Sequence, residues 1–171
     1  MDSIRERMVK FFHLFRHYYL GICFIGIAAF VLQEIPYIIM PLIKHASNPM
    51  MNMRNEMKWI ETVQGMLGFL CMALLMLIVR EDVGSFSGAE GREKTFLYLT
   101  LLMILINFVG WTFYYLGYQY GWLIVLSQFA AVPLYYLFFG LWQRNYVLAG
   151  AAVPFFVIHT INGVMIFIVR K

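Results

Sequence analysis

The sequence FVLQEIPY, residues 30–37, places the carboxylate of Glu34 two residues before Pro36 inside a long apolar run. The run exceeds the roughly 18 residues that mark a membrane-spanning helix. An ionisable side chain at membrane depth costs from about 2 to more than 10 kcal/mol, so it usually faces a protein interior and serves a function. We therefore expect Glu34 to face other helices.

The composition of the whole chain favours the same environment. Of the 171 residues, 62% are hydrophobic and only 13% are charged, and the mean hydropathy is +0.73. Because a water-soluble domain is normally about a quarter charged, this composition predicts a polytopic membrane protein. We expect residues 1–171 to form a single transmembrane domain.

The apolar runs predict an all-α integral membrane protein, a bundle of five transmembrane helices. The expected spans are residues 18–43, 59–79, 95–116, 121–141 and 146–169. Residues 1–17 interleave aromatic and basic side chains, which predicts an amphipathic helix on the membrane surface. A plain cytoplasmic extension of the first span fits that pattern equally well.

Lysine and arginine residues flank the predicted spans rather than forming a stripe, so we expect no nucleic-acid partner despite a net charge of +4. With the N-terminus inside, the inner segments hold more basic residues than the outer ones. The sequence therefore predicts a plasma-membrane protein with a cytoplasmic N-terminus and an external C-terminus.

Each predicted span carries a strong hydrogen-bonding side chain at a similar depth. Counted with a rise of 1.5 Å per residue, these side chains lie between about 8 and 13 Å below the outer boundary of the hydrocarbon core. They are Glu34, Gln64, Asn107, Gln128, His159 and Asn162. Because lipid cannot satisfy such groups, the pattern predicts a shared polar pocket in the outer half of the bilayer.

The pattern leaves three functions open. The first is binding or translocation of a small amphipathic or cationic ligand or lipid, with Glu34 as counter-charge or proton carrier and Trp111 covering the apolar part. The second is a lipid- or isoprenoid-modifying enzyme with Glu34 and His159 as acid and base. The third is an accessory or immunity subunit whose spans pack on a larger membrane complex, with an apolar stripe on the outside of the bundle and no enclosed pocket. Taken singly, amides such as Gln64 fit a role in joining helices equally well.

The segment between the first two spans contains a weak copper motif. Thioether and imidazole groups suit Cu(I), and the candidate ligands are His45, Met50, Met51 and Met53. An amphipathic loop on the outer interface explains the same residues better, so we expect neither a metal nor a cofactor. The expected partners are the lipid bilayer, the ligand, and either a second copy of the chain or a partner membrane subunit.

Overall fold

The computed structural model describes residues 8–39, 42, 49–50, 58–80, 83 and 91–169. Its elements, in chain order, are β1 (Met8–Phe15), β2 (Tyr18–Cys23), α1 (Phe24–Ile39), α2 (Lys58–Leu77), β3 (Ile78–Arg80), α3 (Arg92–Tyr115), α4 (Gly121–Ile124), the π-helical η4 (Val125–Ala130), α5 (Ala131–Trp142), α6 (Tyr146–Val164) and the π-helical η5 (Met165–Val169).

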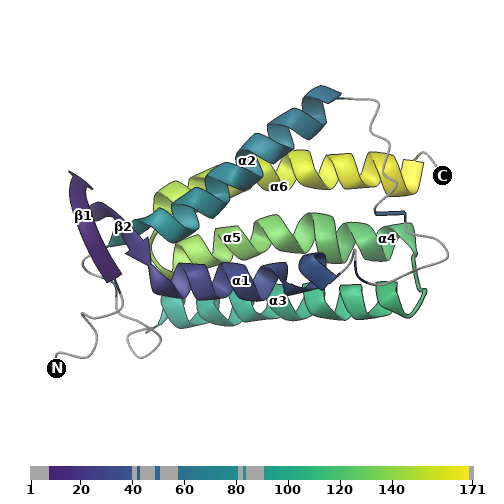
Figure 1. Ribbon diagram of the computed structural model, residues 1–171, viewed down its shortest axis with the longest axis horizontal. Helices are drawn as coiled ribbons and strands as arrows, with labels where there is room; N and C mark the ends of the chain where they lie inside the picture. The colour runs from purple at the N-terminus through teal and green to yellow at the C-terminus, as the bar shows by residue number, and fades with distance from the viewer. Residues whose placement is uncertain are drawn as a thin grey trace.

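The described part of the chain is mostly helical, and it contains four helices long and apolar enough to cross a membrane. They are α2, α3, the continuous helix Gly121–Trp142, which joins α4, η4 and α5, and the continuous helix Tyr146–Val169, which joins α6 and η5. The last four predicted spans are confirmed as helices, except that residues 78 and 79 of the span 59–79 belong to β3. Figure 1 shows the long helices side by side, with α2 tilted across α6 and α1 beside α3 and α5.

The prediction of an all-α fold with an N-terminal amphipathic helix is wrong over the described residues. Strands β1 and β2 form an antiparallel hairpin, and β2 also pairs with β3. Aromatic and β-branched residues make up half of β1 and half of β2, and such residues favour strands. Arg16, in the turn, has a φ of 48°, which a helix does not allow. Residues 1–7 lie outside the described part.

The sheet shortens the first predicted span. Residues 18–23 belong to β2, and α1 keeps 16 residues. A helix of that length rises about 24 Å, less than a hydrocarbon core of about 30 Å. The sheet covers one end of the bundle, so α1 begins there and runs toward the opposite end (Figure 1).

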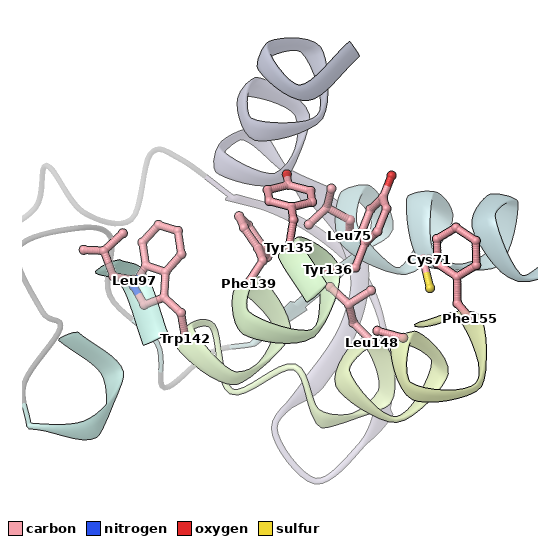
Figure 2. Close-up of a cluster of buried hydrophobic side chains, with 10 residues drawn as sticks. Cys71, Leu75, Leu97, Tyr135, Tyr136, Phe139, Trp142, Leu148 and Phe155 are labelled. Carbon is pink, nitrogen blue, oxygen red and sulfur yellow. The ribbon is translucent and has the colours of Figure 1, made fainter. Parts of the chain in front are cut away.

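The main hydrophobic core lies between α2, α5 and α6, where the cluster in Figure 2 includes Leu75, Tyr135, Tyr136, Leu148 and Phe155. The hydroxyl groups of Tyr135 and Tyr136 point in the same direction, away from Leu148. Both tyrosine side chains are buried, at 0% and 3% exposure. The core therefore contains polar atoms on one side.

Close approach of α1 to α2 depends on a glycine. A Cβ atom on Gly26 would lie 2.1 Å from the carbonyl oxygen of Leu75. Because the obstacle is backbone, the two helices can accept a larger residue only by moving apart. Small residues at such crossings let membrane helices pack closely.

We predict that Gly26→Ala lowers the stability of the detergent-solubilised protein by about 1–3 kcal/mol, because a methyl group overpacks this crossing. The measurement is thermal unfolding followed by circular dichroism. Gly150→Ala is the matched control, since a Cβ there meets no atom within 4 Å. Equal unfolding temperatures for the two variants would show that α1 does not pack on α2 in this way.

Candidate functional site

Asn107 is the centre of one hydrogen-bonded group inside the bundle. Its side-chain oxygen accepts from Gln33 Nε2 at 3.2 Å. Its Nδ2 donates to the carbonyl oxygen of Ser127 at 2.9 Å and to the hydroxyl of Tyr37 at 3.3 Å. Asn107 and Gln33 are completely buried. A single amide therefore joins α1, α3 and η4.

Local sequence explains how η4 comes so close to α3. A Cβ atom on Gly110 would lie 2.0 Å from Ser127 Oγ, so only glycine leaves room for Ser127. The Ser127 hydroxyl donates to the carbonyl of Leu123 in the same continuous helix. The backbone carbonyl of Ser127, within the π-helical segment, accepts the hydrogen bond from Asn107. π-Helical segments are rare and frequently occur at functional sites.

A second group joins α2 to α6. The Gln64 oxygen Oε1 lies 3.0 Å from Asn162 Nδ2 and 3.0 Å from His159 Nδ1. Because a carboxamide oxygen only accepts, this arrangement assigns the proton to Nδ1 of the imidazole. The ring of His159 lies between those of Phe129 and Phe155, with centroid distances of 4.6 and 5.0 Å.

A proline supports contact between η4 and α6. Pro133 has no backbone N–H, which leaves the carbonyl of Phe129, four residues earlier, without its usual helical partner. The hydroxyl of Thr160 on α6 donates to that carbonyl at 3.5 Å. The freed backbone acceptor is thus satisfied within the protein, as an apolar surrounding requires.

Glu34 belongs to neither group. It is half-buried and forms no hydrogen bond or ion pair with any residue that the structure describes. It interacts electrostatically with Tyr37 of its own helix and with Tyr135 and Tyr136 of α5. Among the described residues, Glu34 therefore has aromatic neighbours and no cationic partner, and no hydrogen bond links it to His159.

Trp111 and Gln128 are buried beside these groups, each at 1% exposure. The Trp111 ring packs edge-on against Tyr37 and Tyr114, at 4.9 and 5.3 Å. Several buried polar atoms have no hydrogen-bond partner among the described residues: Gln33 Oε1, Trp111 Nε1, the Tyr135 hydroxyl and both amide atoms of Gln128. Unsatisfied buried groups of this kind are suited to hold water or a polar ligand.

The polar residues singled out from the sequence are thus divided between two hydrogen-bonded groups, with Glu34 and Gln128 apart. Sequence reasoning missed Gln33 and the carbonyl of Ser127. Two features of the sequence could have identified Gln33 as a site residue. A carboxamide inside an apolar run needs a hydrogen-bond partner, and Gln33 lies on the same helix face as Tyr37, four residues later.

Of the copper candidates, only Met50 lies in the described part. It is buried against Trp111 and Tyr114, and its backbone N–H donates to the Tyr114 hydroxyl at 3.1 Å. His45, Met51 and Met53 are outside the described residues. Comparison with known protein families, with curated proteins and with solved structures finds no match for the chain.

We predict that Asn107→Leu lowers the free energy of unfolding in detergent by about 2–4 kcal/mol, because it strands the buried amide of Gln33 and the carbonyl of Ser127. Thermal unfolding measures the change. The control is Thr112→Val on the same helix, where the exposed hydroxyl donates only to the carbonyl of Phe108 in α3. A wild-type unfolding temperature for Asn107→Leu would contradict the role of this amide in joining three elements.

Proposed function

We propose that the chain is an integral membrane protein that binds a small amphipathic cation beside Glu34. The observation that carries this proposal is the half-buried carboxylate that has no ion pair or hydrogen bond with any described residue. At membrane depth such a group requires a proton, a cation or a ligand as its partner.

Membrane insertion is supported by the outer surface of the helices. Large apolar side chains are exposed on every long helix, including Phe69 on α2, Leu105 on α3, Leu126 on η4 and Ile161 on α6. Soluble monomers rarely expose so much continuous apolar surface. Hydrogen bonds inside the bundle join Gln33 to Asn107 and join Gln64 to His159 and Asn162, which is the arrangement that a lipid surrounding favours.

The orientation follows from the distribution of basic residues. The end of the bundle that carries the sheet holds Lys10, Arg16, Arg80, Arg92, Lys94 and Arg144, whereas Lys58 is the basic residue of the opposite end within the described residues. Cytoplasmic segments carry an excess of lysine and arginine. We therefore assign the sheet to the cytoplasmic side of a plasma membrane and the C-terminus to the outside.

The chemistry around Glu34 selects a cationic, partly apolar ligand. The charge of Glu34 acts on the buried side chains of Tyr135 and Tyr136 of α5, and Tyr37 lies one turn after Glu34 on α1. Aromatic faces attract organic cations by about 0.5–2 kcal/mol, most strongly where water is excluded. A carboxylate with aromatic neighbours suits a hydrophobic ammonium or phosphonium ion better than a small hydrated cation.

We predict that the wild-type protein, reconstituted in phospholipid vesicles, binds tetraphenylphosphonium saturably, and that Glu34→Gln weakens this binding by about tenfold or more. The substitution keeps the shape of the side chain and removes its charge. Equilibrium dialysis with the labelled cation measures the affinity, with protein-free vesicles as the baseline.

Glu61→Gln is the matched control, because Glu61 is an exposed acid in the first turn of α2. It should bind tetraphenylphosphonium like the wild type, and the anion tetraphenylborate should show no saturable binding to any variant. Equal affinities of wild type and Glu34→Gln for the cation would refute the proposed role of Glu34.

A further inference from the structure

A second, apolar site lies on the opposite side of α1. Glu34 is two residues beyond Leu32, which is about 200° around the helix, and Leu32 lines a partly open groove of about 320 Å³. The groove runs between α1, α3 and α5, and its walls include Ala28, Leu32, Leu101, Ile104, Phe139 and Trp142.

The groove is apolar because of its residue types. Alanines at positions 28 and 29 leave space where larger side chains would fill the interval between α1 and α3. Thr100 also lines it, but its hydroxyl donates to the carbonyl of Phe96 in the same helix. The walls therefore offer hydrocarbon contact and no free hydrogen-bonding group from Thr100.

The dimensions suit one acyl chain. Along α1 the groove extends from Phe24 to Leu32, a rise of about 12 Å, and it begins at the sheet end of the bundle. One leaflet of a hydrocarbon core is about 15 Å deep. A lipid of the sheet-side leaflet can therefore lay most of one chain in the groove with its headgroup at the level of the sheet.

Charges at that level favour an anionic headgroup. Lys94 lies seven residues, or two helical turns, before the groove residue Leu101 and on the same face of α3. Lys94 and Arg92 are exposed and form no ion pair with any described residue, whereas Arg144 is paired with Glu93. Lys94 also lies over the ring of Tyr98, at 6.0 Å.

We propose that the groove between α1, α3 and α5 binds an acyl chain of an anionic phospholipid whose headgroup contacts Lys94. The site rests on the membrane insertion proposed above, but it is independent of the ligand beside Glu34. A basic residue near a membrane surface contributes to such attraction together with the buried apolar chain.

Native mass spectrometry of the full chain in detergent, with added dioleoyl phosphatidylglycerol or dioleoyl phosphatidylcholine, tests the proposal. We expect more bound phosphatidylglycerol than phosphatidylcholine. Lys94→Gln should weaken phosphatidylglycerol binding by about fivefold, whereas Lys58→Gln, at the other end of the bundle, should not change it.

Filling the groove should abolish the bound lipid. Ala28→Trp fills it from α1 and Leu101→Trp fills it from α3, so the test remains decisive when one of them fails to fold. The control is Val153→Trp, at an exposed position on α6. The proposal is wrong if a folded groove-filling variant binds as much lipid as the wild type. It is also wrong if the wild type is a dimer without bound lipid and the groove-filling variants are monomers, because the groove would then bind a second copy of the chain.

Glu34→Gln separates this site from the proposed function. It should leave phosphatidylglycerol occupancy unchanged while it weakens tetraphenylphosphonium binding. Loss of lipid in Glu34→Gln would contradict the separate groove, whereas unchanged binding of the cation would contradict only the proposal for Glu34.

Discussion

Hydrocarbon provides no hydrogen-bond partner for an amide, and this constraint explains how α1 is held. The helix has 16 residues, and its side chains are mostly apolar. Hydrophobic contact alone therefore favours no particular rotation of α1 about its own axis. Gln33 supplies that preference by donating to Asn107, which is itself fixed by the carbonyl of Ser127. The pair is buried completely, so turning α1 by one residue would leave the Gln33 amide nitrogen and the Asn107 amide oxygen without a partner, each at a cost of about 1–3 kcal/mol.

With this orientation fixed, α1 presents different chemistry on each side. The Gln33 side binds to α3, the Glu34 side carries a half-buried carboxylate whose charge acts on the tyrosines of α5, and the side with Ala28 and Leu32 borders the apolar groove. The close crossing of Gly26 over Leu75 fixes the start of the helix on α2. The proposed site for a cation and the proposed groove for an acyl chain therefore lie on different faces of one short helix, because successive residues point about 100° apart.

The four long helices could be predicted from the sequence because an apolar run longer than a bilayer permits few alternatives. The N-terminal strands could not, because Phe11, Phe12 and Phe15 suit an amphipathic helix and an edge strand alike, and pairing with β2 decides between them. Depth counting brought Gln64, Asn162 and His159 to one level, since it needs only the helical rise. It does not give rotation about each helix axis, so it did not reveal that Asn107 contacts Gln33 instead of Glu34.

The central claim is that α1 holds position 34 half-exposed at membrane depth. Electron paramagnetic resonance tests it most directly, with a nitroxide attached to a cysteine at position 34 in a chain that lacks Cys23 and Cys71 and is reconstituted in a bilayer. Reference labels at Leu105, which is exposed on α3, and at Lys58, at the end of the bundle, define the lipid and interfacial limits. The account predicts that the label at position 34 collides with oxygen, though less than the label at Leu105, and hardly with a water-soluble nickel chelate. Nickel collisions equal to those at Lys58, or a rigid label that oxygen does not reach, would contradict it.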